Sequence, residues 1–175
     1  PISGTSSKAA VPSLIDSTLD KEQFEYEIKM TERPGHASEL AAEARDNHAD
    51  IVVAVGGDGT VNEVARSLVH SDSALGILPC GSGNGLARHL LLPMNLKKSI
   101  EIINACEIHD LDYGVINEYP FFCTCGMGFD AFVSMKFAES GKRGPISYAE
   151  NILREGLKYE PETYTLEDET GTKQY

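Results

Sequence analysis

The stretch that decides the fold is Ile51-Val52-Val53-Ala54-Val55-Gly56-Gly57-Asp58-Gly59-Thr60-Val61-Asn62-Glu63-Val64. Its first five residues are apolar and rich in β-branched side chains, which predicts a buried strand. Three glycines and an aspartate come next. Apolar residues then recur at the i, i+3, i+4, i+7 spacing of a helix, at Val61, Val64, Ala65 and Leu68. The stretch therefore predicts a strand, a glycine-rich loop and the start of a helix.

The predicted loop has the properties of a phosphate-binding site. Glycine permits positive φ and lets the backbone approach a ligand without a Cβ in the way. The start of a helix offers unpaired N–H groups and the positive end of a dipole to an anion. Asp58 beside a polyphosphate would need a divalent cation between them, or would accept a proton from the substrate. A tight turn in which Asp58 only caps the helix is the alternative.

A second loop of the same kind follows the next predicted strand. Residues 75–79 form a short apolar strand candidate, residues 80–85 are rich in glycine, and residues 86–92 have the composition of a helix. Two such units place both loops at the carboxyl edge of one parallel sheet, where these folds bind ligands. Neither loop matches the P-loop, because no Lys-Ser/Thr pair follows the glycines. The sequence thus predicts a nucleotide held by two loops without a Walker lysine.

The rest of the chain continues the alternation of strands and helices, which predicts an α/β fold with a parallel sheet. Helices are expected over residues 6–19, 36–48, 95–105, 129–138 and 147–158. A strand is expected over residues 24–30, and residues 107–117 and 121–126 are expected to pair antiparallel around a turn at Glu118-Tyr119-Pro120. Residues 164–170 alternate as a strand that has just begun.

Composition excludes several classes of protein. The formal net charge of −12 argues against nucleic-acid binding, which needs a basic face, and against simple electrostatic attraction of the whole chain to an anionic membrane. No apolar run has transmembrane length. The four cysteines are scattered without a Cys-x-x-Cys pair, which indicates reduced thiols in a cytoplasmic protein. The five histidines show no metal-ligand spacing, and we assign none of them a catalytic role. The sequence leaves the ligands of a metal unknown.

The two loops resemble the catalytic domain shared by diacylglycerol kinases, sphingosine kinases and bacterial lipid kinases. The motifs that carry the resemblance are Gly-Gly-Asp-Gly-Thr-Val-Asn-Glu-Val at 56–64 and Leu-Pro-Cys-Gly-Ser-Gly-Asn-Gly-Leu-Ala-Arg-His-Leu at 78–90. Segments 1–4, 31–37, 110–114 and 126–131 match further family motifs in the expected order. Gly-Gly-Asp-Gly alone, at 56–59, also occurs in NAD kinases and 6-phosphofructokinases, so the ordered set of motifs is the more specific signal. Gly85 and Ser82 depart from the bacterial pattern and follow the sphingosine-kinase style, as does segment 31–37.

The resemblance implies a fold and a domain order. It implies an α/β nucleotide-binding domain over residues 1–160 that lacks its first strand, followed at residues 161–175 by the start of an all-β second domain. On this reading we expect the 175-residue stretch to be poorly soluble on its own, or to form a homodimer through its sheet edges.

The resemblance also implies an activity. It points to a lipid kinase that uses ATP and Mg²⁺ to phosphorylate a primary hydroxyl of diacylglycerol or a sphingoid base. The lipid would be met at a membrane surface by a cytoplasmic, peripheral protein without a transmembrane segment. A soluble small-molecule kinase of the NAD-kinase type is the nearest alternative, and a nucleotide-binding regulatory module without catalysis is another.

Asp58 is the expected catalytic residue, because a kinase acting on an alcohol needs a carboxylate to orient the hydroxyl, accept its proton or hold Mg²⁺. Thr60 and Glu63 also have the spacing of a capping box, so structural and functional roles compete there. Asp112 and Asp130 are candidates for contact with the lipid head group, although Asp130 could equally cap a helix. The expected nucleotide contacts are Ser3, Thr31, Gly56, Gly57, Asp58, Gly59, Thr60, Val61, Asn62, Glu63, Gly81, Ser82, Gly83 and Asn84.

Overall fold

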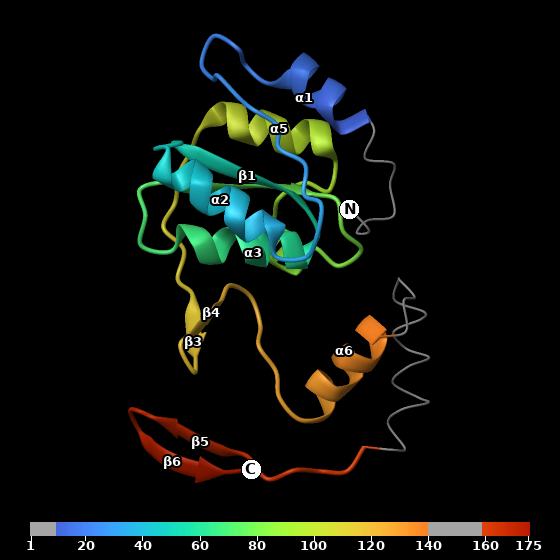
Figure 1. Cartoon of the computed structure of the whole chain (residues 1–175), viewed down its shortest axis with the longest axis vertical. Helices are drawn as coiled ribbons and strands as arrows, with labels where there is room; N and C mark the ends of the chain where they lie inside the picture. The colour runs from blue at the N-terminus through green and yellow to red at the C-terminus, as the bar shows by residue number, and fades with distance from the viewer. Residues whose placement is uncertain (1–9, 140–158) are drawn as a thin grey trace. The chain divides into compact units, whose positions relative to one another are not determined.

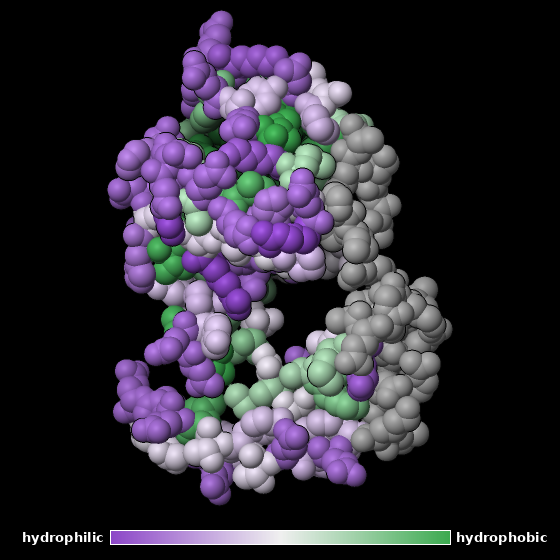
Figure 2. Space-filling view, viewed as in Figure 1, coloured by the Kyte–Doolittle hydropathy of each residue, from purple (hydrophilic) through white to green (hydrophobic). Residues whose placement is uncertain are grey.

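The structure, a computed structural model, describes residues 10–139 and 159–175, which belong to two compact units (Figure 1). The first unit extends to Thr124 and the second begins at Cys125. The units divide earlier in the chain than the domain boundary predicted after residue 160, which stays a prediction. Where the first unit faces the viewer in Figure 2, hydrophilic residues cover most of its surface.

A parallel two-stranded sheet lies at the centre of the first unit. β1 (Ile51–Gly56) pairs with β2 (Ala74–Pro79) in a register that sets Ile51 opposite Ala74 and Gly56 opposite Pro79. The parallel pairing confirms the α/β fold that the alternating elements predicted. Because both strands run in the same direction, the loops that follow them leave from the same edge.

Helices cover both sides of this sheet. Figure 1 shows α2 (His36–Asp46) and α3 (Asp58–Leu68) on one side, and α5 (Leu96–Ala105) with α1 (Val11–Thr18) on the other. Each begins close to where the sequence predicted a helix, within the described residues. Pro12 lies in the first turn of α1, where its missing N–H costs no hydrogen bond. Asn95 caps α5 by accepting a hydrogen bond from the Lys98 N–H at 3.1 Å.

The core of the first unit lies between the sheet and α2, α3 and α4 (Gly85–His89). All four residues of α3 that recur at helical spacing are buried, which confirms the periodicity argument. The small residues of α2 allow this helix to approach α3 closely. The central cluster comprises Ala37, Ala41, Ala54, Val61, Val64, Leu68, Ile77, Leu86 and Ala87.

One predicted helix is shorter than expected, and one predicted strand is not formed. α4 ends at His89, before the predicted end at Leu92, and Leu91 has a left-handed backbone with φ 57°. The strand predicted over residues 24–30 is not formed, and the side chains of Tyr26, Ile28 and Met30 are exposed. The alternating pattern fits a strand, but strand structure needs a hydrogen-bonded neighbour, and the described residues offer none to this segment.

The predicted antiparallel pair forms a shorter hairpin. β3 (Gly114–Ile116) pairs with β4 (Tyr119–Phe121), and Ile116 lies opposite Tyr119. The turn consists of Asn117 and Glu118, whose φ angles are 46° and 69°. The predicted turn at residues 118–120 was wrong, because a two-residue turn with both φ angles positive matches the twist of the strands and leaves Tyr119 and Pro120 in β4.

The second unit contains one described helix and one hairpin. α6 (Phe129–Glu139) confirms the helix predicted over residues 129–138. β5 (Thr165–Asp168) and β6 (Gly171–Gln174) pair antiparallel, which confirms the strand expected near residue 164 and adds its partner. The helix predicted over residues 147–158 lies outside the described residues. Within the described ranges, none of the helices has the length and apolar character to cross a bilayer.

Candidate functional site

Both glycine-rich loops start at the same edge of the sheet, as the sequence predicted. Gly56 ends β1 opposite Pro79, which ends β2. The Cys80 N–H donates to the Gly56 carbonyl at 2.8 Å, so the strand pairing continues into the second loop. The first loop passes directly into α3 and the second into α4. The helices α3 and α4 therefore begin beside one sheet edge. Unpaired N–H groups in the first turn of α3, which has no side-chain cap, favour an anion there.

The two loops pack against each other through Gly57 of the first loop and Gly81 of the second. A Cβ added at Gly57 would lie 3.0 Å from the Gly81 Cα, and a Cβ at Gly81 would clash with the Gly57 Cα. A Cβ at Gly83 would lie 2.7 Å from Asp58 Oδ2. Positive φ does not explain these glycines, and among the loop residues it is Asn84 that has a left-handed backbone, with φ 54°. Close packing of one loop on the other requires glycine at Gly57, Gly81 and Gly83.

Gly59 differs from its neighbours. A Cβ placed on Gly59 would meet no atom of the described residues within 4 Å, whereas one on Gly56 would lie 2.5 Å from Thr60 Oγ1. Gly59 is exposed in the first turn of α3, where alanine would be the better helix former. Neither packing nor backbone conformation explains glycine here. The space above Gly59 is open to a ligand.

Asp58 joins the two loops. Its Oδ2 accepts a hydrogen bond from the Asn84 N–H at 2.9 Å, and its Oδ1 accepts one from the Gly85 N–H at 2.5 Å. Asp58 is the first residue of α3, and the cap of that helix, Gly57, has no side-chain hydrogen bond. The alternative that Asp58 caps its own helix is therefore wrong. Its carboxylate instead caps the start of α4 from across the site.

The buried side chain of Asn84 stabilises the second loop by hydrogen bonds to its backbone. Its side chain is buried, its Oδ1 accepts from the Gly81 N–H and its Nδ2 donates to the Gly81 carbonyl, both at 2.8 Å. Arg88, whose role the sequence left open, donates from Nε to the Gly83 carbonyl at 2.9 Å. Its position one turn after Asn84 on α4 was the signal that could have identified it. Ser82 and Gly83, at the tip of the loop, are exposed.

Glu63 fixes the start of α2. Its carboxylate accepts hydrogen bonds from the Gly35 N–H at 3.1 Å and the Ala37 N–H at 3.2 Å. The Glu63 carbonyl also accepts from the Ser38 hydroxyl at 2.9 Å. A capping box with Thr60 is wrong, because α3 begins at Asp58 and Thr60 already lies inside the helix. Glu63 instead holds the start of α2 against α3.

The remaining predicted nucleotide contacts have different surroundings. The Val61 side chain is buried and its N–H donates to the Gly57 carbonyl at 3.0 Å, so Val61 contributes to the core. Thr31 and Asn62 are half-buried, in the segment before α2 and in the first half of α3. Ser3 lies outside the described residues. Contact of these residues with a nucleotide stays a prediction.

The two acidic residues predicted to contact substrate lie in different units. Asp112 is exposed in the segment between α5 and β3 of the first unit. Asp130 is in the first turn of α6 in the second unit. Among the described residues, no group of three or more His, Cys, Asp or Glu side chains could hold a metal ion. Asp58 is the carboxylate at the two loops, so a cation bound there would need further ligands from phosphate oxygens and water.

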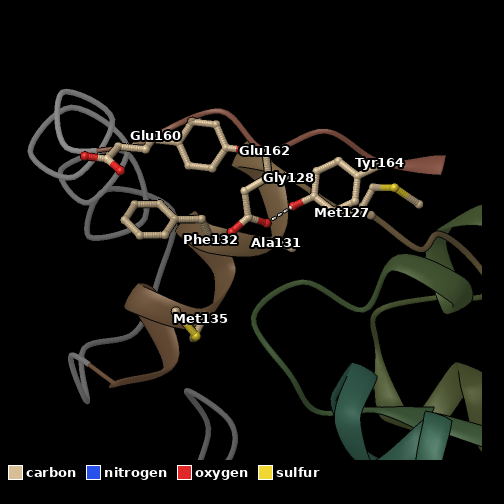
Figure 3. Close-up of a pocket in the computed structure, with 10 residues that line it drawn as sticks. Met127, Gly128, Ala131, Phe132, Met135, Glu160, Glu162 and Tyr164 are labelled. Atoms are coloured by element: carbon tan, nitrogen blue, oxygen red, sulfur yellow. Dashed lines mark hydrogen bonds between the residues drawn. The ribbon is translucent and has the colours of Figure 1, made fainter. Parts of the chain in front are cut away.

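The second unit contains an apolar pocket of about 570 Å³ (Figure 3). Phe132 and Met135 of α6 face it from one side, and Tyr164 lies on the segment that leads into β5. The Tyr164 hydroxyl donates to Glu162 Oε2 at 2.7 Å, and this hydrogen bond raises the pKa of Tyr164 to about 12. The full lining is Gly126, Met127, Gly128, Ala131, Phe132, Met135, Tyr159, Glu160, Glu162 and Tyr164.

Comparison with known proteins gives consistent matches. The chain is 32% identical over 134 residues to a protein named diacylglycerol kinase from Staphylococcus saprophyticus, and this match covers 74% of the chain and 44% of that protein. It is 31% identical over 137 residues to "Probable lipid kinase YegS" from Escherichia fergusonii, covering 74% of the chain and 46% of that protein. The chain thus spans about half the length of the curated relatives it matches.

A solved structure has the same fold. The crystal structure of a diacylglycerol kinase from Bacillus anthracis, strain Sterne, aligns with a TM-score of 0.58 at 23% identity, over 68% of this chain and 44% of that one. The sequence model of the diacylglycerol kinase catalytic domain matches residues 1–116, which include both glycine-rich loops. The chain therefore belongs to the diacylglycerol kinase catalytic domain family.

Proposed function

We propose that the protein containing this chain is a kinase that transfers the γ-phosphoryl group of ATP to a primary hydroxyl of a lipid. The observation that carries the nucleotide assignment is the open first turn of α3. Gly59 is glycine without a packing reason among the described residues, and the exposed Gly83 of the second loop lies against the side chain of Asp58, the residue before Gly59. Backbone N–H groups of both loops can therefore approach phosphate oxygens closely.

Asp58 is suited to act on the reacting groups. A carboxylate has about four lone-pair sites, and the Asn84 and Gly85 N–H groups occupy one on each oxygen of Asp58. One site on each oxygen is left for a substrate hydroxyl or a cation. The two backbone hydrogen bonds fix the orientation of the carboxylate in advance, so less reorganisation is needed when the substrate binds.

Phosphoryl transfer depends mainly on positioning and charge stabilisation. Mg²⁺ bound with ATP would neutralise charge on the phosphates. The residues of this chain would do the rest of the positioning. Glu63 holds the start of α2 against α3, Asn84 braces the second loop through Gly81, and Asp58 would orient the lipid hydroxyl or accept its proton. We propose the sequence-predicted contacts of Ser3, Thr31 and Asn62 as secondary nucleotide contacts.

The apolar pocket of the second unit supports a lipid as the acceptor. Its walls include Phe132, Met135 and Tyr164, which suit a hydrocarbon chain. The names of the relatives favour diacylglycerol as the first substrate to test. Glu160 and Glu162 at the same pocket favour a second candidate, because carboxylates complement the protonated amine of a sphingoid base, which diacylglycerol lacks.

The experiment uses protein of the full length of the relatives, labelled ATP with Mg²⁺, and diacylglycerol, sphingosine and NAD as separate acceptors. Chromatography of the products identifies which acceptor carries the label. We expect label on a lipid, and loss of at least about 10²-fold in turnover in Asp58→Asn. Label on NAD alone, or on none of the acceptors while ATP binds normally, would overturn the lipid-kinase proposal.

A further inference from the structure

The two glycine-rich loops carry little positive charge for a site that handles phosphate. The loops and the helices that follow them, residues 56–68 and 80–89, contain the carboxylates of Asp58 and Glu63 and the guanidinium groups of Arg66 and Arg88. Neither loop has the lysine of a P-loop. Negative charge spreads over the oxygens of a phosphoryl group during its transfer, and kinases stabilise that charge with cations. If these segments supply an arginine or lysine for this purpose, it is one of the two arginines.

Arg66 is at the end of α3 that is distant from the loops. It lies in the last turn of this 11-residue helix, which is about 16 Å long, whereas Asp58 is the first residue. The Arg66 Nε donates to the carbonyl of Pro120 in β4 at 3.1 Å. Arg66 therefore contacts the hairpin of β3 and β4 and not the glycine-rich loops.

Arg88 is held at the exposed tip of the second loop. Its Nε donates to the Gly83 carbonyl at 2.9 Å. Gly83 also lies against the carboxylate of Asp58, because a Cβ added to this glycine would be 2.7 Å from Asp58 Oδ2. The side chains of Arg88 and Asp58, which belong to different helices, thus meet the same residue of the loop.

The guanidinium group of Arg88 keeps donors available although its position is fixed. A guanidinium has five N–H donors in a planar fork, and the Gly83 carbonyl accepts from the one on Nε. Within residues 10–139 and 159–175, Arg88 forms no ion pair, in contrast to Arg33 and Arg45. The side chain is also exposed. Its two Nη groups can therefore bind a phosphate in bidentate fashion.

We propose that the Nη groups of Arg88 contact the γ-phosphoryl group of ATP while it is transferred. This inference rests on the proposed function and adds a second side chain to the reacting centre. The acceptor hydroxyl lies at Asp58, and the phosphoryl group lies between that hydroxyl and Arg88. The hydroxyl oxygen forms a bond to phosphorus, the bond from phosphorus to the bridging oxygen breaks, and ADP leaves with that electron pair. The hydroxyl proton passes to Asp58, while Arg88 stabilises the charge on the phosphoryl oxygens.

The test compares two nucleotides that differ in the γ-phosphoryl group. Full-length protein and Arg88→Gln are titrated calorimetrically with ADP and with the non-hydrolysable β,γ-imido analogue of ATP, each with Mg²⁺. Glutamine has an amide group that can still donate to the Gly83 carbonyl, but it has no charge. We expect the variant to bind the ATP analogue at least about tenfold more weakly, and ADP less than about twofold more weakly, because a charge-assisted hydrogen bond is lost only with the analogue. The kcat with a lipid acceptor should fall by about 10²-fold.

Arg66→Gln is the matched control. Arg66 is also exposed and also donates from Nε to a backbone carbonyl, but it lies at the other end of α3. Arg66→Gln should therefore bind both nucleotides, and turn over, as the parent protein does. Arg88→Lys should recover part of kcat, because it keeps the charge but loses the planar fork.

Two outcomes would overturn the inference alone. An equal loss of affinity for ADP and for the ATP analogue in Arg88→Gln would show that Arg88 only supports the second loop. Affinities and kcat in Arg88→Gln that match those of Arg66→Gln would exclude contact with the phosphoryl group. In both cases the parent protein still binds ATP, and the proposed function stands. If the parent protein binds neither nucleotide, the proposed function and this inference are overturned together.

Discussion

The carboxylate of Asp58 caps the start of α4 through the N–H groups of Asn84 and Gly85, at 2.9 and 2.5 Å. The residue most expected to act in catalysis is thus also the one that ties the two glycine-rich loops together. Asp58→Asn keeps the size of the side chain and removes its charge. We expect turnover to fall by about 10²-fold or more and stability to fall by about 1 kcal/mol. Steady-state kinetics and urea unfolding would measure the two effects.

If Asp58→Asn loses stability but keeps near-normal turnover, Asp58 only connects the two loops by hydrogen bonds and has no catalytic role. If it loses turnover with an intact melting transition, the catalytic assignment stands. Asp58→Glu serves as the matched control. It keeps the charge but lengthens the side chain, which would disturb both hydrogen bonds to α4.

Gly81 and Gly59 should respond in opposite ways to alanine. Gly81→Ala places a Cβ against the Gly57 Cα, so we expect a loss of about 1–3 kcal/mol in the free energy of unfolding. In Gly59→Ala the new Cβ meets no atom of the described part of the chain within 4 Å and lies in a helix, so stability should rise by about 0.5–1 kcal/mol. ATP affinity should nevertheless fall in Gly59→Ala, because the new Cβ occupies the space proposed for phosphate. Denaturant unfolding and calorimetric titration with ATP test the pair.

Glu63→Ala should loosen the start of α2. The variant removes the acceptor of the Gly35 and Ala37 N–H groups, and we expect a loss of about 1 kcal/mol. Hydrogen exchange at these two amides should accelerate, while exchange in the second half of α2 stays unchanged. Exchange rates that match those of the parent protein at both amides would show that Glu63 does not hold this segment in solution.

Tyr164 should ionise late in alkaline solution. Its hydrogen bond to Glu162 raises its pKa from 10.0 to about 12. Because the pKa in the folded state is raised, the stabilising contribution is complete below pH 10 and is lost as the pH rises through about 12. Ultraviolet titration of the parent protein and Tyr164→Phe should differ by one tyrosine that titrates near pH 12, and Glu162→Gln should move it toward 10. A difference spectrum that titrates near pH 10 in the parent protein would contradict this.

The sequence predicted the elements whose local signals and tertiary environment agree. The apolar run of β1 and the helical spacing of α3 are such cases, and both loops follow from them. The prediction of a strand over residues 24–30 was wrong. Alternation of apolar and polar residues indicates which face of a strand would be apolar, but it does not show whether a neighbouring strand is present to pair with it. The hairpin turn was misplaced because Pro120 is a strong turn signal, whereas the twist of the strands selected Asn117 and Glu118.

The contacts between the loops could not be predicted from the sequence. Glycine at position 81 fits a flexible loop or a close approach to a ligand equally well, and the structure shows that the close neighbour is Gly57. In the same way, the Thr60 and Glu63 spacing fits a capping box, but Glu63 reaches across to α2. The role of each of these residues depends on a contact with a residue distant in the sequence. A local sequence pattern carries no information about such contacts.

We propose that both glycine-rich loops bind ATP together. Hydrogen exchange of the full-length protein with and without Mg-ATP tests it most directly. The informative amides are those of Asp58, Gly59 and Thr60 in the first turn of α3 and of Ser82 and Gly83 at the exposed loop tip, since the Gly81, Asn84 and Gly85 amides already donate within the site. We expect Mg-ATP to slow exchange at both sets of amides together. Exchange that is unchanged in both loops at saturating Mg-ATP would contradict it.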